Sequence, residues 1–380
     1  MRWIHNFDSI TYPIDIDRKN MWIKGFPGSG KSILLAYAIK KIERKQPNAS
    51  IVVVVFTHSL IKMFQAAFAE MGVRVKVITY FEFMRGSDRY DYILSDEVQD
   101  MTPRVLEKMR SRGSHVVVAG DENQSIYDVD PRYHEATVST SQIMSILSAE
   151  AYPLNIIHRL SRSIISAVQR FLPRTNIFSA RRDLTKQETQ IRLGVADSGR
   201  EEVEYILREA RRAINVGQTA AILLPTHGAI LDLIQCIIEV EGKPRWAVEN
   251  NTHERPDYRA LNEHLSRNGI QVQYVGNGYG AFSEETRKIA VMTYHSSKGL
   301  DFDNVFVPRL DSSLFIARAE GLAKNLFMVA ITRSRNNLYL TYSGDREHPY
   351  VSSFASDCHR INIRRYLSGQ VPSGGNIFGF

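Results

Sequence analysis

Eight residues near the start of the chain have the types and spacing that phosphate binding requires. The segment GFPGSGKS (25–32) fits G-x-x-x-x-G-K-[ST] and follows a short apolar run, MWIK (21–24). A glycine-rich turn between a strand and a helix lets backbone N–H groups approach phosphate oxygens. Lys31 would bring positive charge to the outer phosphates, and the Ser32 hydroxyl would hold Mg²⁺. The predicted nucleotide-binding residues of this loop are Gly28, Ser29, Gly30, Lys31 and Ser32.

A second segment, DYILSDEVQD (91–100), places an acidic pair at the end of an apolar run. After a phosphate loop, such a pair is the expected partner of magnesium and water. Asp96 would hold the metal, and Glu97 would orient or deprotonate the attacking water. A solvated acidic turn is the alternative, but the apolar run that leads into the pair argues against it. The two segments together predict an ATPase that uses ATP and Mg²⁺.

Both segments lie in a chain whose first half alternates strand and helix. Helical spacing covers 32–45 and 57–71, and apolar or alternating runs cover 51–56, 73–79, 91–96 and 115–121. This alternation predicts an α/β fold with a mainly parallel sheet and helices on both faces. Ligands bind such sheets at the carboxyl ends of the strands, where both segments fall.

From about Ala151 a second pattern of the same kind begins. Its predicted helices are 201–214, 229–240 and 321–334, and its predicted strands are 220–225, 289–294, 304–310 and 337–343. We therefore expect two domains, 1–150 and 151–380, the second with a short loose C-terminal tail. Two similar domains that flank one cleft are a favoured arrangement for a ligand site.

Composition agrees with two domains and a polyanionic partner. The chain has 380 residues, more than one hydrophobic core usually serves, and a net charge of +7. The two cysteines, Cys236 and Cys358, have no metal-ligand spacing, so free thiols are expected. The start lacks the apolar stretch of a signal peptide, and no run is long enough to span a membrane. These features predict a cytoplasmic protein with no membrane partner.

Four motifs resemble those of superfamily 1 helicases, in the order and wording of the UvrD/Rep branch. They are DEVQD (96–100), AGDENQSIY (119–127), TYHSSKGLDF (293–302) and VAITRSR (329–335). The resemblance extends over roughly residues 21 to 342, nearly the whole chain. It implies two RecA-like domains that bind ATP between them and a single strand of nucleic acid across their tops.

The resemblance also assigns roles to residues in the second half of the site. Gln124 corresponds to the sensor of the γ-phosphate. Arg159 and Arg333 correspond to two arginines that neutralise charge in the transition state, an effect of roughly 10³–10⁵ in rate for arginine fingers. The predicted catalytic residues are Lys31, Glu97, Gln124, Arg159 and Arg333. Further nucleotide contacts are predicted for Gly299, for His158 in place of a stacking tyrosine, and for Asp301 in place of a glutamate.

The track for nucleic acid is predicted from the same resemblance. FTHS (56–59) resembles motif Ia, TYFEF (79–83) resembles motif Ib, and the 293–302 motif contacts backbone phosphates in the family. Hydroxyls and cations suit phosphates, and aromatic faces suit bases. The predicted contacts are Phe56, Thr57, Thr79, Tyr80, Tyr127, Thr293, His295 and Lys298. For the phenylalanines of these motifs, packing in the core is the competing interpretation.

The chain departs from the family chiefly by what it omits. Only MRGSDRY (84–90) separates TYFEF from DYILSDE, where larger relatives insert the 1B subdomain. Between Val240 and the 293–302 motif there is room for about a hairpin and a helix, not for the 2B subdomain. In addition, Val129 and Asp130 replace an aromatic residue and an arginine. We therefore expect weaker binding of nucleic acid at residues 129–130 and weak unwinding by the chain alone.

Three functions remain for the chain. The first is an ATP-dependent translocase or helicase on single-stranded DNA, 3′ to 5′ by resemblance, with RNA not excluded. The second is a switch subunit in which ATP turnover controls docking to a protein partner that supplies unwinding or nuclease activity. The third, a small-molecule kinase, fits poorly with the paired arginines and the helicase motifs.

Overall fold

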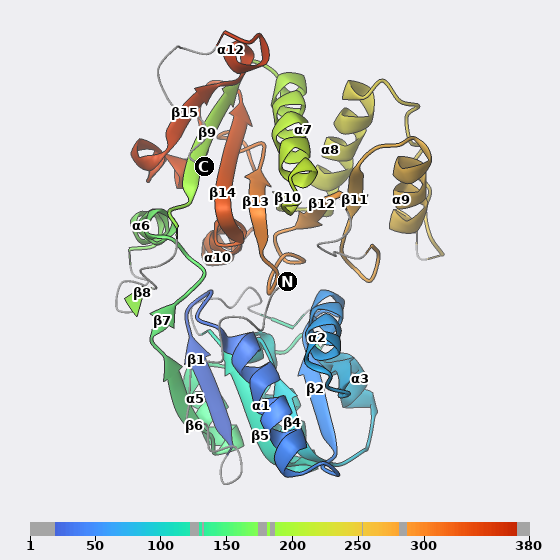
Figure 1. Cartoon of the computed structure of the whole chain (residues 1–380), viewed down its shortest axis with the longest axis vertical. Coiled ribbons are helices and arrows are strands. Elements are labelled where there is room, and N and C mark those ends of the chain that lie inside the picture. Colours follow the sequence, from blue (N-terminus) through green and yellow to red (C-terminus); the bar gives the residue numbers. More distant parts are fainter. Residues whose placement is uncertain are drawn as a thin grey trace.

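The chain forms two sheets, one in each half, that stand one above the other along the longest axis (Figure 1). The computed structural model describes residues 20–121, 129–130, 133–173, 181–182, 187–252, 254–280 and 287–370. Neighbouring strands of both sheets are parallel, and helices cover their faces. The predicted α/β class with two mainly parallel sheets is confirmed.

The first sheet has the strand order β3-β2-β4-β5-β1-β6. Its strands are β1 (Met21–Gly25), β2 (Ile51–Val55), β3 (Lys76–Thr79), β4 (Tyr90–Ser95), β5 (Gly113–Gly120) and β6 (Glu150–Leu154). Four of the five residues of β2 are buried, as expected for a β-branched strand covered on both faces. The phosphate loop follows β1 and the acidic turn follows β4, with only β5 between them. Parallel pairing therefore brings both segments to one edge of the sheet.

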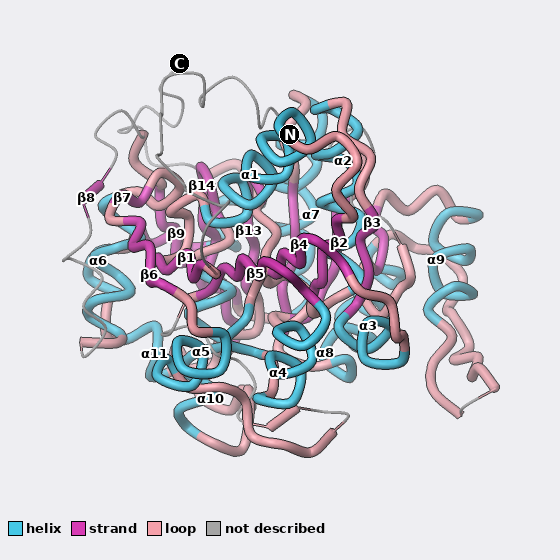
Figure 2. The backbone as a smooth tube through the Cα atoms, turned by 90° about the horizontal axis from the view of Figure 1, so that it is seen from below, coloured by secondary structure: helices cyan, strands magenta, loops and turns pink. Residues whose placement is uncertain are grey.

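Helices cover both faces of the first sheet. Figure 2 shows α1 (Lys31–Lys45) and α2 (His58–Met71) on one face and α3 (Tyr80–Arg85), α4 (Pro103–Arg112) and α5 (Thr140–Leu147) on the other. A short 3-10 turn, η1 (Val98–Asp100), follows the acidic pair. Ser139 begins α5 with a capping box that it forms with Gln142, which satisfies backbone donors at this end.

The second sheet has the order β11-β12-β10-β13-β14-β9-β15. Its strands are β9 (Gln190–Ala196), β10 (Ala220–Leu224), β11 (Val272–Tyr274), β12 (Ile289–Thr293), β13 (Phe302–Val307), β14 (Ser334–Ser343) and β15 (His359–Asn362). A two-stranded sheet of β7 (Ile156–Ile157) and β8 (Arg181–Arg182) lies beside the link between the halves (Figure 1). All five residues of β10 and of β12 are buried, so both strands lie in the middle of a covered sheet.

The remaining helices belong to the second half. They are α6 (Arg162–Phe171), α7 (Gly199–Asn215), α8 (His227–Val240), α9 (Tyr258–Arg267), α10 (Glu320–Ile331), α11 (Pro349–Ser352) and α12 (Ile363–Leu367), with the 3-10 turn η3 (Ala355–Asp357). Ser198 caps the N-terminus of α7, and its side chain accepts a hydrogen bond from the backbone N–H of Glu201. Its buried positions, which include Val203, Ile206 and Ala210, recur at helical spacing and pack against the sheet.

The core joins the two halves. One cluster of buried apolar side chains includes Leu35 and Phe64 from the first half and Leu223 and Phe327 from the second. The ring of Phe171 in α6 packs edge-on against Phe327 in α10, with centroids 5.2 Å apart. The link between the sheets is therefore packed against the second half.

Some elements differ from those that the sequence predicts. The predicted boundary at 150/151 falls inside β6, which pairs with β1 and so belongs to the first sheet. Between α8 and β12, where the sequence leaves room for about a hairpin and a helix, the structure has the helix α9 and the strand β11, which pairs parallel to β12. In the described part of the chain, no helix has the length and apolar character needed to cross a membrane.

Candidate nucleotide site between the two sheets

The phosphate loop connects the last residue of β1, Gly25, to the first residue of α1, Lys31. Gly28 and Gly30 have φ angles of 73° and 91°, a region that glycine adopts without steric cost. A Cβ on Gly28 would lie 2.4 Å from the Cβ of Arg159. The backbone conformation and this close approach both require glycine at position 28.

Lys31 is held inside the loop that precedes it. Its side chain is buried, and Nζ donates hydrogen bonds to the carbonyl oxygens of Gly25 and Phe26 at 2.7 and 3.1 Å. The N-terminus of α1 adds the positive end of its dipole at the same place. An ammonium group, a helix N-terminus and a glycine-rich turn together suit the phosphates of a nucleotide.

Ser32 and Asp96 form the pair that could hold a metal ion. The Ser32 hydroxyl donates a hydrogen bond to Oδ2 of Asp96 at 2.5 Å, and Oδ1 of Asp96 accepts from the backbone N–H of Glu97 at 2.9 Å. Burial, reinforced by the charge of Glu97, raises the pKa of Asp96 to about 6. A cation bound by these oxygens would favour the ionised form of Asp96 and offset the effect of burial. Hydroxyl and carboxylate oxygens are the ligands that Mg²⁺ prefers. The residues therefore fit Mg²⁺.

Glu97 is held as a buried carboxylate. Its backbone is left-handed, with φ of 55°, and the side-chain amide of Gln99 donates to Oε2 at 2.5 Å. Burial raises the pKa of Glu97, but the charges of Lys298 and Lys31 outweigh burial, so the pKa is lowered overall. Gln99 also accepts a hydrogen bond from the backbone N–H of Asp121, which ties the acidic turn to the end of β5. An ionised carboxylate in this position can accept a proton from water.

Lys298 reaches this turn from the second half. It follows β12, is 3% exposed, and places Nζ 2.5 Å from Oδ2 of Asp100 and 3.6 Å from Oε2 of Glu97. Beside it, Gly299 has φ of 83°, and a Cβ there would lie 2.4 Å from Cδ2 of Leu60 in α2. The two halves are thus joined at the acidic turn by a buried ion pair and by close packing.

Arg159 lies against the phosphate loop. The backbone N–H groups of His158 and Arg159 both donate to the carbonyl oxygen of Gly28, at 2.9 and 3.1 Å. Among the described residues, the buried Nε atom of Arg159 has no hydrogen-bond partner. Burial lowers the pKa of Arg159, while the nearby charges of Asp301 and Glu97 raise it. This guanidinium therefore has hydrogen-bonding capacity left beside the loop.

Arg333 approaches from the end of α10. It is 2% exposed, and its guanidinium donates to the carbonyl oxygens of Val329 and Leu300 and to the hydroxyl of Thr332. Burial and the positive charge of Arg159 lower the pKa of Arg333 to about 9, so the side chain stays protonated at neutral pH. An anion near both guanidinium groups would offset the repulsion between them.

Comparisons with known proteins identify the two halves separately. Residues 246–345 match the UvrD-like helicase C-terminal domain, and residues 12–130 match an AAA domain, together more than half of the chain. The F-box DNA helicase protein 1 of Schizosaccharomyces pombe is 24% identical over 321 residues, which are 70% of this chain and 35% of that protein. The RecBCD enzyme subunit RecB of Chlamydia pneumoniae is 36% identical over 63 residues, which are 17% of this chain and 6% of that protein.

The two domain matches and the yeast relative together support a UvrD/Rep-like superfamily 1 helicase. The chain spans about a third of the length of this yeast relative. Among solved structures, a complex of the arterivirus nonstructural protein 10 helicase with DNA is 13% identical with a TM-score of 0.45, over 88% of this chain and 62% of that one. The AAA and helicase domains imply the use of a nucleotide, ATP, by this chain.

Several other predicted site residues are placed as follows. Ser29 is buried in the phosphate loop. His158 adjoins the loop through its backbone, and Asp301 lies 3.6 Å from the guanidinium of Arg335. Gln124 and Tyr127 lie outside the described residues. The roles of all these residues stay predictions.

Four of the side chains predicted to contact nucleic acid have partners within the protein in this structure. Phe56 and Tyr80 are buried and stacked on each other, with centroids 4.9 Å apart and planes within 7°. The Thr79 hydroxyl accepts from the backbone N–H of Glu82 and so begins α3. Lys298 faces carboxylates inside the contact between the halves. These four side chains are thus engaged in the core, a helix cap or an ion pair, and their roles in binding nucleic acid stay predictions.

The other predicted contacts remain candidates. Thr57 precedes α2 and is part-exposed, and its hydroxyl has no hydrogen-bond partner among the residues that the structure describes. Thr293 is buried and exchanges hydrogen bonds with Ser296, while His295 is part-exposed. These three residues stay predicted contacts.

Sequence reasoning missed the partners of the acidic pair. Gln99 positions Glu97, and Asp100 receives Lys298. Both belong to the DEVQD motif, so the signal was present. Gln99 acts on a residue two positions away, whereas the role of Asp100 depends on a contact across the fold.

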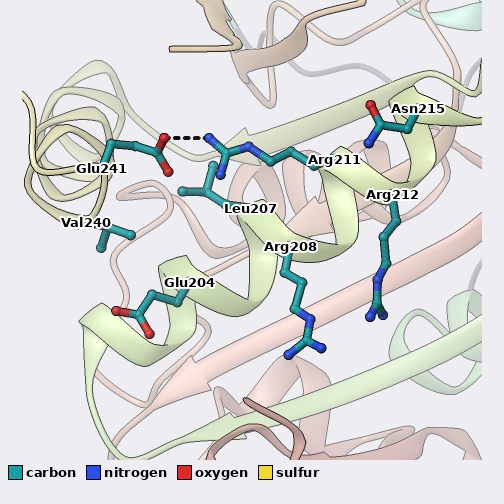
Figure 3. A pocket seen from close by; sticks show the side chains of 8 residues that line it. All are labelled: Glu204, Leu207, Arg208, Arg211, Arg212, Asn215, Val240 and Glu241. Carbon is teal, nitrogen blue, oxygen red and sulfur yellow. Dashed lines mark hydrogen bonds and ion pairs between the residues drawn. The ribbon is translucent and has the colours of Figure 1, made fainter. Parts of the chain in front are cut away.

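A groove of about 350 Å³ lies elsewhere, on the outer side of the second half between α7 and α8. Its eight lining residues are labelled in Figure 3. Three arginines line it, but Arg211 pairs with Glu241 and Arg212 pairs with Glu209, each at 2.7 Å. The groove contains none of the residues predicted for the nucleotide or for nucleic acid.

Proposed function

We propose that this chain is an ATP-driven motor that acts on single-stranded DNA. One observation carries the proposal: the part-exposed Arg159 adjoins the phosphate loop, and the buried Arg333 lies within electrostatic reach of both Arg159 and Glu97. Such a pair of cations needs a polyanion to offset its mutual repulsion. A triphosphate held by Lys31 would supply it.

Each side chain then has a defined task. The loop and Lys31 bind the phosphates, and Ser32 and Asp96 would hold Mg²⁺, which supplies further positive charge to the phosphate oxygens. Glu97, kept ionised and oriented by Gln99, accepts a proton from the attacking water.

Arg159 and Arg333 stabilise the negative charge that develops on the transferred phosphoryl group. Because Arg333 donates to two backbone carbonyl oxygens in this structure, its guanidinium must reorient when it meets that group. Closure of the two halves around ATP would provide that movement.

Movement along a strand requires that ATP change the contact between the halves. The Lys298–Asp100 ion pair lies in that contact, next to the proposed base. If binding or loss of the γ-phosphate alters this pair, the halves close and open, and their alternating grip yields steps along the strand. The free energy of closing the two halves must differ between the ATP-bound and product-bound states, or no work is done.

DNA is the proposed track because the first relative is named a DNA helicase and the chain carries a net charge of +7. By resemblance to the UvrD/Rep branch, we propose 3′ to 5′ movement. The F-box helicase is much longer than this chain, so its activity is carried over here only as a proposal.

A second candidate is a nucleic-acid-dependent ATPase switch that recruits or regulates a partner such as a nuclease. The short connection between α3 and β4, residues 86–89, favours it. No accessory subdomain can fit there, and accessory subdomains take part in strand separation in larger relatives. A protein partner would supply the missing function.

Steady-state ATP hydrolysis tests the proposal. We expect single-stranded DNA to stimulate turnover more than single-stranded RNA or duplex does. The variant Lys31→Ala should show no stimulated turnover in any of these reactions. Equal basal turnover with and without every nucleic acid would reject the motor and leave an ATPase of another kind.

Displacement of streptavidin from biotinylated single strands separates the two candidates. A 3′ to 5′ motor displaces streptavidin from the 5′ end and not from the 3′ end. A switch hydrolyses ATP without displacing it from either end. On a tailed duplex we expect weak unwinding by the chain alone.

A further inference from the structure

A cluster of aromatic side chains lies at the carboxyl ends of β10, β11 and β12. The rings of Tyr258 and Tyr274 are stacked, with centroids 3.9 Å apart and planes within 20°. His227 packs against both, and the ring of Tyr279 lies 6.1 Å from that of Tyr258. These four residues, the aromatic cluster, come from the start of α8, the start of α9, the end of β11 and the turn that follows β11.

A tight turn fixes the position of Tyr279. Gly276 and Tyr279 exchange backbone hydrogen bonds at 3.0 and 2.8 Å, and the two residues between them, Asn277 and Gly278, have φ angles of 50° and 83°. Positive φ at both central residues of a two-residue loop is typical of the type I′ turn, for which Asn-Gly is the preferred sequence. The side-chain amide of Asn277 lies 3.2 Å from Nε2 of His227. The turn is therefore rigid and tied to the cluster.

The cluster has a buried base and a part-exposed edge. Tyr258 and Tyr274 are 5% and 0% exposed, which core packing explains. Tyr279 and His227 are part-exposed, and packing does not require an aromatic ring in a turn at the surface. Tyr279 therefore has a supporting ring on one side and solvent on another.

The same cluster has polar atoms that the protein leaves unused. Within the described part of the chain, the buried hydroxyl of Tyr274 and Nδ1 of His227 have no hydrogen-bond partner. Leaving a buried polar group unpaired costs about 1–3 kcal/mol in general.

The cluster lies where the two halves meet. Lys62, an exposed residue of α2 in the first half, donates a hydrogen bond to the carbonyl oxygen of Gly280, the residue after Tyr279. Two predicted phosphate contacts lie at β12, the strand next to β11: Thr293 is its last residue, and His295 follows it. Tyr279 thus directly precedes a residue that binds a cation from the first half, and an aromatic ring near a cation is a combination that binds single-stranded nucleic acid.

We propose that Tyr279 is a stacking surface for one base of the single strand, on the second half of the chain beside α2. This inference rests on the proposed action on nucleic acid and deepens it, because it names a base contact in the second half. Stacking on an aromatic ring tolerates any base, so the contact adds affinity without sequence preference.

The test compares the variants Tyr279→Ala and Tyr279→Phe with the unchanged chain. Fluorescence anisotropy measures binding of a labelled oligothymidine and of an abasic strand of the same length. Tyr279→Ala should bind oligothymidine about 10-fold more weakly, since one base loses its stack. Tyr279→Phe should bind as the unchanged chain does. All three proteins should bind the abasic strand equally, because it retains only phosphates and sugars.

Controls separate the inference from the function on which it rests. Tyr37→Ala removes an exposed tyrosine from α1 in the other half and should leave binding unchanged. Equal affinity of Tyr279→Ala and the unchanged chain for oligothymidine, or an equal loss on the abasic strand, overturns the stacking role alone. If the unchanged chain binds neither strand, the proposed function fails and the inference fails with it. Thermal melting of Tyr279→Ala should match that of the unchanged chain, and a lower melting temperature would assign Tyr279 to the core instead.

Discussion

Removal of the Lys298 charge should destabilise the chain far more than removal of a surface lysine. Lys298, Asp100 and Glu97 have side chains that are 4%, 1% and 10% exposed, so water screens their interaction little. The variant Lys298→Met keeps the length of the side chain but removes the cation that lies 2.5 Å from Oδ2 of Asp100 and 3.6 Å from Oε2 of Glu97. Breaking a buried pair in this way costs about 3–5 kcal/mol. We expect a loss of that size in the free energy of unfolding.

Urea denaturation followed by circular dichroism measures this loss. The matched control is Lys324→Met, whose partner Glu320 lies one turn away on α10 with a side chain 74% exposed. Exposed pairs of this kind contribute about 0.2–0.5 kcal/mol, so the control should unfold nearly as the unchanged chain does.

A double-mutant cycle makes the test specific to the pair. Asp100→Leu in the Lys298→Met background removes one stranded carboxylate and should recover part of the lost stability. The coupling energy between the two positions should be about 2–3 kcal/mol, which is the upper end of the range found for pairs of residues in contact. A loss below about 1 kcal/mol in Lys298→Met, or strict additivity of the two changes, would refute the reasoning.

Three further outcomes are expected. Glu97→Gln should lower single-turnover hydrolysis by about 10²–10⁴-fold while fluorescent ATP still binds, and unchanged hydrolysis would show that another group is the base. Gly28→Ala should impair turnover, because its Cβ would lie 2.4 Å from that of Arg159 and φ there is 73°; a fully active variant would contradict this close approach. Burial, with the charges of Lys298 and His227, lowers the pKa of His295 from 6.5 to about 4, so the unfolded chain takes up the proton first. The stability that neutral His295 contributes is thus present above pH 6.5 and is lost as the pH falls toward 4, by up to ~3 kcal/mol. In melting experiments at different pH values, His295→Gln should lose less stability over this range.

The sequence predicts best what local pattern determines. The phosphate loop needs glycine at fixed positions between a strand and a helix, and Gly28 and Gly30 have the positive φ angles that such a loop uses. The valine-rich run at 51–55 can only be a strand covered on both faces, and it is one. Parallel strands then bring the acidic turn to the same edge as the loop without any further information.

Contacts between distant segments could not be predicted in this way. The membership of β6 in the first sheet depends on its pairing with β1, more than a hundred residues earlier in the chain. Lys298 and Asp100 are 198 positions apart, so only the docking of the two halves brings them together. The same reason explains Phe56 and Tyr80: a motif shows that they are aromatic, but only packing decides whether a ring faces solvent or the core.

A crystal structure of the chain with ADP, aluminium fluoride and Mg²⁺ tests the central proposal most directly, since this complex imitates the transferred phosphoryl group. We expect the fluoride to lie within hydrogen-bonding distance of Lys31, Arg159 and Arg333, with Glu97 against the water in line. A complex in which either arginine remains turned away from the fluoride would contradict the proposed mechanism of ATP hydrolysis.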